Sequence, residues 1–255
     1  MSLAAGRFAD IVQIVSDRRA VRVEDLSSQL GVSPATVRRD LIELDRVGRL
    51  RRVHGGAVSI DGKLEERVFE DKASIAQGEK KAIAERAASF IERNDCVYLD
   101  GGSTILHLAR LLLEDTSLTI VTNSLRVAMV LSGRGPRTIL VGGELRRLSQ
   151  TFVGTLTTSI LDQLHLDKAF MGTIGISIED GMTTTDPDEA FTKQLIIRKA
   201  QRVLLLSDSS KMGKTAFAHA GNLEDIDYLI TDDKLSAAYA RQLRRRNIEV
   251  ICATS

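Results

Sequence analysis

The chain has 255 residues, of which 43% are hydrophobic and 27% are charged, as in a globular protein with one large domain or two smaller ones. Its net charge of +1 is close to neutral, and no run approaches the roughly 20 apolar residues that span a bilayer. The first residues lack the basic segment and cleavage site of a secretory signal. These features argue against a membrane protein or a secreted one, and we expect a cytoplasmic protein.

Cysteine and histidine usage gives no sign of a metal or a redox centre. Cys96 and Cys252 each lie in an apolar, strand-like run, where buried and inert thiols are expected. The histidines show no spacing typical of metal ligands; they are His54, His107, His165 and His219. We therefore expect neither a metal ion nor a cofactor.

The basic residues are concentrated at the N-terminal end. Residues 1–58 contain ten arginines, no lysine and seven acidic residues, a net charge of +3, whereas the rest of the chain carries 25 basic and 27 acidic residues, a net charge of −2. Four of these arginines fall in RVGRLRRVH, residues 46–54, which holds no acidic residue. This asymmetry favours a polyanionic partner for the N-terminal segment.

Residues 1–58 carry the pattern of three short helices. The first has apolar residues at helical spacing, at Phe8, Ile11, Val12 and Val15. The second is shorter, is ended by Gly31, and has its apolar face at Val23, Leu26 and Leu30. The third begins at Ser33 as N-cap with Pro34 at the first helical position, and its inward face is formed by Val37, Leu41 and Leu44.

Two short helices joined by a glycine turn form a helix-turn-helix, whose second helix can enter the major groove of DNA. Beyond it, RLRRVHGGAV predicts two short strands turned at Gly55-Gly56, a basic wing for the sugar–phosphate backbone. A solvated helical hairpin with surface arginines is the alternative, but the ordered set of signals favours DNA binding. The candidate contacts on the third helix and the wing are Ser33, Thr36, Arg38, Arg39, Arg51, Arg52 and His54.

These residues also carry a family resemblance. Arg7, Ile11, Val15 and Ser33, followed by TVRRDL and LRRVHGGA, closely resemble the DeoR family of bacterial transcriptional regulators, and the resemblance continues over nearly the whole chain. It implies repression of a sugar or polyol utilisation operon, a homodimer or homotetramer on double-stranded operator DNA, and an effector domain similar to ribose-5-phosphate isomerase. It also implies that this domain binds a small phosphorylated metabolite, such as a sugar, sugar acid or polyol phosphate.

Residues 59–78 are polar and lack sustained periodicity, which predicts a linker between a DNA-binding domain at 1–58 and an α/β domain at 79–255. In the second domain, helical segments alternate with short apolar runs, which indicates a mostly parallel sheet covered on both faces. The strand-like runs are CVYLD, LTIVT, RTILV, KAFMGT, RVLLLS, DYLIT and IEVIC.

Several of these runs end in small or polar residues, at the edge where open α/β sheets bind ligands. The turn at 101–104 opens a helix, whose free N–H groups and dipole favour a phosphate. We expect Lys211 to pair with the same phosphate. The candidate effector contacts are Asp100, Gly102, Ser103, Thr104, Asn123, Ser124, Glu189, Lys193, Asp208 and Lys211.

The stretch TDPDEAFTK has two interpretations. Asp186, Pro187 and Glu189 fit a capping box, and Glu189 and Lys193 fit an ordinary surface ion pair at i, i+4, neither of which requires a ligand. The related isomerases, however, place a Glu and a Lys on a helix at their sugar pocket. An active phosphosugar isomerase with a DNA-binding appendage is the alternative function. Against it, the region that corresponds to the isomerases' acidic loop reads GTIGISIEDGMTT, and this departure leaves no obvious second acid in place, so we expect a sensor without catalytic residues.

Overall fold

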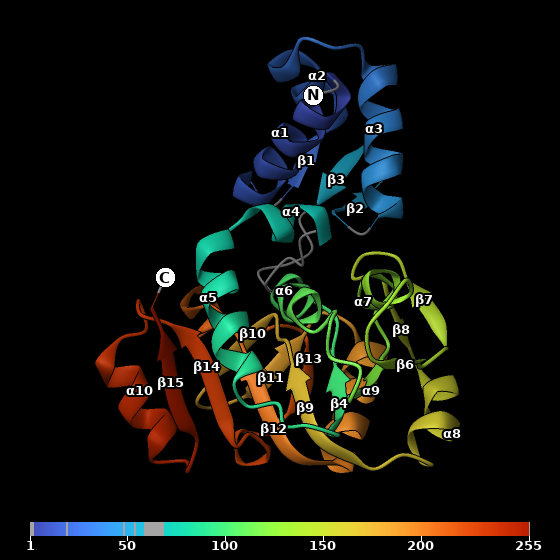
Figure 1. Ribbon diagram of the computed structural model, residues 1–255. Coiled ribbons are helices and arrows are strands. Elements are labelled where there is room, and N and C mark those ends of the chain that lie inside the picture. The colour runs from blue at the N-terminus through green and yellow to red at the C-terminus, as the bar shows by residue number, and fades with distance from the viewer. Residues whose placement is uncertain (1–2, 19, 48, 54, 59–68, 255) are drawn as a thin grey trace. The chain divides into compact units, whose positions relative to one another are not determined.

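The computed structural model describes residues 3–18, 20–47, 49–53, 55–58 and 69–254, and the chain divides into two compact units, residues 1–67 and 68–255 (Figure 1). The division falls inside the segment expected to be a linker, 59–78. Residues 59–68 lie outside the described residues, so the boundaries of the linker remain a prediction. Residues 69–78 contain the helix α4 (Phe69–Ser74) and the beginning of α5 (Gln77–Ala88).

The first unit contains the three predicted helices, α1 (Leu3–Arg18), α2 (Val23–Leu30) and α3 (Pro34–Arg46). Gly31 ends α2 in a left-handed conformation with φ 65°. Ser33 is the N-cap of α3, where its hydroxyl accepts a hydrogen bond from the N–H of Thr36 at 3.2 Å. The apolar faces of the three helices meet in one core, which includes Ile11, Leu26, Val37, Leu41 and Leu44.

The predicted wing is present as β2 (Arg51–Val53) and β3 (Gly56–Val58), paired antiparallel. A third strand, β1 (Ala20–Arg22), pairs with the other edge of β3, which the sequence analysis missed. Three residues between two helices are too few to show the alternation that identifies a strand. The unit is therefore a winged helix-turn-helix, as predicted.

The second unit is built on a sheet of seven parallel strands among the described residues, in the order β15-β14-β12-β9-β4-β5-β6. All seven coincide with the predicted apolar runs. Their bounds are β4 (Cys96–Leu99), β5 (Thr119–Thr122), β6 (Arg137–Leu140), β9 (Leu166–Met171), β12 (Ala200–Leu206), β14 (Tyr228–Asp232) and β15 (Glu249–Ala253).

Helices cover both faces of this sheet (Figure 1). Successive side chains of β4 point to opposite faces, so Val97 and Leu99 belong to one core cluster and Tyr98 to the other. The first cluster includes residues of α4, α5, α6 (Ser103–Leu111) and α7 (Leu125–Leu131). The second includes residues of α8 (Thr158–Leu161), α9 (Pro187–Lys199) and α10 (Ala237–Arg244). None of the described helices is long and apolar enough to cross a membrane.

Short elements between the large strands were not predicted. A three-stranded sheet joins β10 (Gly175–Ser177), β11 (Gly181–Thr184) and β13 (Ala218–Gly221), and a hairpin joins β7 (Glu144–Arg146) and β8 (Thr151–Val153). Single 3₁₀ turns occur at η1 (Thr155–Thr157), η2 (Ser209–Lys211) and η3 (Leu223–Asp225). Such elements contain too few residues for a period to be recognised.

The strand order fixes where a ligand can approach. From β4 the chain proceeds outward through β5 and β6 in one direction, and through β9, β12, β14 and β15 in the other. Neighbouring loops after β4 and β9 therefore diverge to opposite faces, which opens a crevice at their carboxyl ends. Asp100 and the residues after it lie at this position.

The expectation of two buried thiols is wrong for Cys252, which is exposed, and Cys96 is only partly buried. Cys252 lies on β15, an edge strand of the large sheet, where no neighbouring strand covers one side. Both cysteines are free thiols.

Candidate functional site

The recognition surface of the first unit is the outward face of α3. Its inward residues are fully buried, whereas Ala35, Arg39 and Ile42 are exposed on the opposite side. Arg38 is also exposed and lies 3.9 Å from Glu24 of α2, a solvated contact that contributes little to stability. Both arginines have the reach to contact a base edge or a phosphate.

The remaining DNA candidates lie at the start of α3 and in the wing. The hydroxyls of Ser33 and Thr36 are 2.9 Å apart at the N-terminus of α3. Arg52 is exposed on β2, and its N–H donates to the carboxylate of Asp45 at 3.0 Å, which ties the wing to α3. Arg51 belongs to β2, and the prediction for His54 falls outside the described residues.

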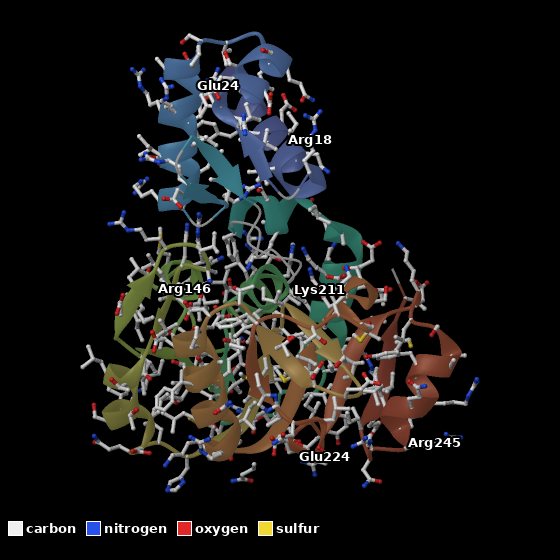
Figure 2. All side chains as sticks on the ribbon, turned by 180° about the vertical axis from the view of Figure 1, so that it is seen from behind. Arg18, Glu24, Arg146, Lys211, Glu224 and Arg245 are labelled. Atoms are coloured by element: carbon white, nitrogen blue, oxygen red, sulfur yellow. The ribbon has the colours of Figure 1, made fainter. Side chains whose placement is uncertain are left out.

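The candidate effector residues lie at the carboxyl ends of β4, β5 and β12 and on α9. We call them, together with the unpredicted Lys80 and Arg146, the strand-end site. In Figure 2, Arg146 and Lys211 both lie at this end of the large sheet, and Glu224 lies at the opposite end. The predicted members are Asp100, Gly102, Ser103, Thr104, Asn123, Ser124, Glu189, Lys193, Asp208 and Lys211.

Asp100 and Lys193 form the centre of the site. Lys193 reaches from α9 to the end of β4, where its ammonium donates to the carboxylate of Asp100 and, at 3.0 Å, to the carbonyl of Gly172. Asp100 also accepts a hydrogen bond from the N–H of Gly172 at 2.9 Å. Both side chains are almost fully buried, 3% and 4% exposed, so the pair joins β4, β9 and α9 in a low-dielectric interior.

Glu189 extends this charged chain. Its carboxylate lies 3.7 Å from Lys193 and 3.2 Å from the guanidinium of Arg146, which lies 3.2 Å from Asp186 as well. Asp186 is the N-cap of α9, as predicted, and accepts from the N–H of Glu189 at 2.9 Å. The interpretation of Glu189 and Lys193 as an ordinary surface pair is wrong, because both side chains are buried.

The turn before α6 has the geometry of an anion site. Gly102 has φ 137°, a conformation that favours glycine, and leads directly into the helix. Ser103 and Thr104 occupy its first turn and are each 8% exposed. The hydroxyl of Ser103 donates to the backbone carbonyl of Lys72 at 3.5 Å. Backbone N–H groups of a first helical turn have no acceptor within the helix, so an anion is stabilised there.

Asn123 and Ser124 follow β5 and are buried. The amide nitrogen of Asn123 donates to the carbonyl of Phe152 at 2.9 Å, whereas its side-chain oxygen has no hydrogen-bond partner among the described residues. Ser124 is the N-cap of α7 and accepts from the N–H of Val127 at 3.3 Å. The structure therefore gives Ser124 a capping role, while Asn123 retains an acceptor for a ligand.

Asp208 follows β12, and its charge acts on Lys80 of α5. Asp208 is buried and caps η2 by accepting from the N–H of Ser210 at 3.1 Å. Lys80 of α5 is 5% exposed, and burial lowers its pKa to about 8, with a smaller lowering by Lys211 and an opposing effect of Asp208. Lys80 is therefore still largely charged at neutral pH, although it is held away from water.

Sequence reasoning missed Lys80, Arg146 and Tyr98. Lys80 stands on the apolar face of α5, in helical register with Ile83, Ala84 and Ala87, a position that would have identified it. Arg146 lies in the short hairpin β7–β8 and carries no such signal. Tyr98 is fully buried on β4, where burial and the nearby Asp100 raise the pKa of its hydroxyl and keep it neutral.

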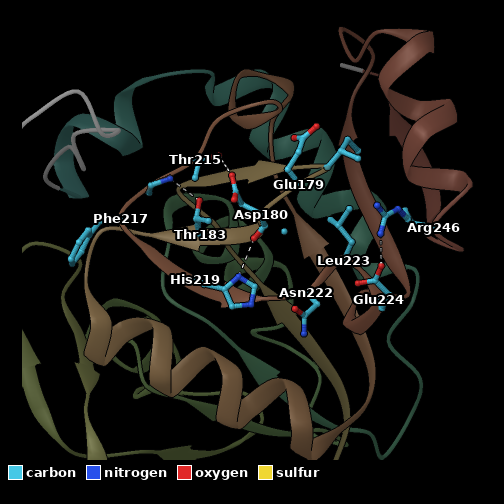
Figure 3. A pocket seen from close by; sticks show the side chains of 13 residues that line it. Glu179, Asp180, Thr183, Thr215, Phe217, His219, Asn222, Leu223, Glu224 and Arg246 are labelled. Atoms are coloured by element: carbon cyan, nitrogen blue, oxygen red, sulfur yellow. Dashed lines mark hydrogen bonds and ion pairs between the residues drawn. The ribbon is translucent and has the colours of Figure 1, made fainter.

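A separate cavity of about 480 Å³ lies beside the β10–β11 hairpin (Figure 3). Asp180 faces it and accepts from Thr215 at 2.7 Å, and Arg246 pairs with Glu224 at 2.7 Å. No predicted effector residue is among the residues that line it. Glu179 and Asp180, the two acids of the segment GTIGISIEDGMTT, both line this cavity. Among the described residues, no group of three or more His, Cys, Asp or Glu is arranged to hold a metal ion.

The comparisons with known families agree with both units. Residues 7–63 match the DeoR-like helix-turn-helix domain, and residues 75–233 match the DeoR C terminal sensor domain. Because the sensor domain match alone spans more than half of the chain, the family is established.

Curated relatives cover nearly the whole chain. The HTH-type transcriptional regulator GlpR of Haloferax volcanii is 37% identical over 98% of this chain and 98% of its own. The putative aga operon transcriptional repressor of Escherichia coli O157:H7 is 33% identical over 96% of this chain and 92% of its own. The lactose phosphotransferase system repressor of Streptococcus mutans is 36% identical over 89% of this chain and 91% of its own.

Among solved structures, a D-ribose-5-phosphate isomerase in complex with phospho-erythronic acid matches 53% of this chain and 54% of its own, with 19% identity and a TM-score of 0.41. The curated relatives, which match over both units, are named as transcriptional regulators and repressors, so the chain is a regulator and not an enzyme. Its winged helix-turn-helix binds DNA, its second unit is a sensor for a small molecule, and the chain belongs to the DeoR family of transcriptional regulators.

Proposed function

We propose that the protein represses genes for the use of a sugar or polyol and leaves its operator when a phosphorylated sugar, sugar acid or polyol binds at the strand-end site. Two of the relatives are named as repressors, of an aga operon and of a lactose phosphotransferase system, which supports repression and a carbohydrate effector. A DNA-binding regulator acts on the chromosome, so we place the protein in the cytoplasm.

The observation that carries the proposal is the loop Asp100–Thr104, which joins two chemically different halves of the site. Its last residues begin α6, where Ser103 shares a backbone acceptor with the buried cation Lys80, and the charge of Lys211 acts on that cation. Its first residue, Asp100, is part of a buried chain of alternating carboxylates and cations. A phosphate fits the first half, and hydroxyl groups fit the second.

In this arrangement the phosphate is held by Gly102, Ser103, Thr104 and Lys211, with Asp208 fixing the turn that carries Lys211. The hydroxyls bind Asp100, Glu189, Lys193 and Asn123, all from the buried half. The free acceptor of Asn123 selects a donor, such as a hydroxyl, from the ligand. We place Ser124 in the same wall as the residue that fixes the loop after β5.

On DNA, the outward face of α3 enters the major groove. Arg39 reads a base edge, and the flanking contacts come from Ser33, Thr36 and Arg38. The wing residues Arg51, Arg52 and His54 contact the sugar–phosphate backbone. Paired half-sites require at least two copies of this unit, so we propose a homodimer or homotetramer.

The effector must bind more tightly to the conformation that cannot bind DNA than to the one that can, because equal affinity for both would leave the equilibrium between them unchanged. A reversal from 99% competent to 99% incompetent requires about 5.5 kcal/mol of differential binding. The strand-end site offers this difference only if its occupation changes the part of the chain that leads to the first unit.

A thermal-shift screen with phosphorylated sugars, followed by operator binding in fluorescence anisotropy, tests the proposal. We expect one class of phosphorylated compound to raise the melting temperature and weaken operator binding, and both effects to be lost in Ser103→Asp. Ser236→Asp is the control, because Ser236 also lies at a helix N-terminus, as the N-cap of α10, but follows a strand three places from β4. Operator affinity that stays unchanged at saturating effector would refute the proposal.

A further inference from the structure

Two donors of the strand-end site converge on one backbone oxygen. The ammonium of Lys80 and the hydroxyl of Ser103 both donate to the carbonyl of Lys72, in the last turn of α4. Lys80 also donates to the carbonyl of Ile75 at 2.7 Å. Ser103 and Lys80 are thus joined by a backbone carbonyl oxygen, which occupies the position where an anion would accept hydrogen bonds from both side chains.

Helix α4 is short and is held by few contacts. Its six residues leave terminal carbonyls without partners in the helix, and Lys80 donates to one of them, that of Lys72, at the end where the dipole is negative. Phe69 is buried against the first core cluster, and the guanidinium of Arg126 lies 5.3 Å from its ring centre. Ala76, which separates α4 from α5, has φ 52°, a left-handed conformation unfavourable for alanine.

Lys80 also belongs electrostatically to the proposed phosphate site. It is buried, and the charges that act on it include Asp208 and Lys211 at the end of β12. Ser103 on α6 and Lys80 on α5 therefore meet at one place, and the charge of Lys211 on η2 acts on Lys80. The last turn of α4 projects its carbonyl oxygens into that place.

We propose that the phosphate of the effector and the last turn of α4 compete for Lys80 and Ser103. The inference rests on the proposed function and adds the means by which binding is transmitted. Without ligand, α4 is docked through its carbonyls. With ligand, the phosphate oxygens take both donors and α4 loses its C-terminal anchor.

This competition has a consequence for DNA binding. In the chain, α4 is the first described element after residues 59–68, which join the two units covalently. Release of α4 lengthens the connection between the units, and we expect this to change how two DNA-binding units engage paired half-sites. The effector thus binds better to the state with α4 undocked, which supplies the differential affinity that regulation requires.

The first test uses inorganic phosphate and a variant that weakens the competitor. Phe69→Ala removes the buried anchor of α4 without altering any proposed ligand contact. If the docked turn is about 90% populated, phosphate affinity should rise by roughly tenfold, as measured by isothermal titration calorimetry on the full chain. Phe90→Ala is the matched control, since Phe90 packs against the same cluster outside α4 and should not strengthen binding. Equal or weaker affinity in Phe69→Ala than in Phe90→Ala would overturn the competition.

The second test begins with the unmodified protein. Hydrogen exchange of the amides in 69–76 should accelerate when phosphate saturates the unmodified protein, and unchanged or slower exchange would overturn the inference. Lys80→Met should weaken phosphate binding at least about tenfold, and unchanged affinity would remove Lys80 from the site. If phosphate binds and Ser103→Asp abolishes it, but α4 does not respond, only this inference fails. If phosphate does not bind at all, the proposed function fails with it.

Discussion

Replacing Asp100 with asparagine tests whether the strand-end site is built on a buried ion pair. The substitution leaves a side-chain oxygen for the N–H of Gly172 but removes the charge that faces Lys193. Loss of one partner of a buried pair costs about 3–5 kcal/mol. Lys193 retains the carbonyl of Gly172 at 3.0 Å and the carboxylate of Glu189 at 3.7 Å, so we expect a loss of about 2–3 kcal/mol in the free energy of unfolding.

The measurement can be confined to the second unit. The chain has no tryptophan, and its three tyrosines, Tyr98, Tyr228 and Tyr239, all lie in the second unit. Urea unfolding followed by tyrosine fluorescence in the full chain therefore reports on that unit alone. For a domain of this size, the expected loss corresponds to a decrease in melting temperature of about 4–12 °C.

A matched control separates burial from charge. Glu85→Gln removes a carboxylate from the exposed i, i+4 pair with Lys81, at 3.8 Å, and should cost no more than about 0.5 kcal/mol. The double-mutant cycle of Asp100→Asn and Lys193→Met should give a coupling energy above about 1 kcal/mol. A cost for Asp100→Asn equal to that of Glu85→Gln, or additive single effects, would refute the reasoning.

Arg39→Ala should weaken operator binding by about 1–3 kcal/mol and relax the base preference at one position of the half-site; an unchanged preference in competition anisotropy would exclude base reading by Arg39. Arg52→Ala should weaken binding to operator and random DNA alike and reduce the slope of log K against log salt by about 1, and loss of operator affinity alone would contradict a backbone contact. Burial lowers the pKa of Lys80 to about 8, below the ordinary value of 10.5, so the folded state binds fewer protons than the unfolded state between these values. The free energy of unfolding of the unmodified protein, relative to that of Lys80→Met, should therefore rise with pH. We expect a rise of about 2 kcal/mol between pH 7 and 10.5 after allowance for solvent screening. If urea unfolding shows a difference between the two proteins that does not change with pH, the lowered pKa is contradicted.

The fold was predictable where the signal is local and repeated. All seven strands of the large sheet contain a short continuous apolar run, since a parallel sheet is covered on both faces. The helix N-caps were also predictable, because the side chains of Ser33 and Asp186 accept hydrogen bonds from the N–H groups three residues further along the chain. Strand β1 and the hairpins β7–β8 and β10–β11 were missed, since three or four residues show no period.

The strand-end site was only partly predictable. Asp100, Ser103 and Asp208 follow strands, and the carboxyl ends of parallel strands meet at one edge, so their proximity followed from the strand pattern. Nothing in the sequence indicated that Lys193 would be buried against Asp100, which lies 93 residues earlier. A Glu and a Lys four residues apart form an exposed pair on most helices, and only the surroundings of α9 remove water from them.

The sequence by itself determined that the chain has a winged helix-turn-helix followed by a parallel α/β unit, because caps, turns and apolar periodicity act between near neighbours. The tertiary structure decided which polar groups share one interior: it brought Arg146 to Glu189, Lys193 to Asp100, and the last turn of α4 to Lys80 and Ser103. These contacts depend on the strand order and on how loops cross the end of the sheet. Strand order is set by the packing of the whole unit, so no local pattern could reveal them.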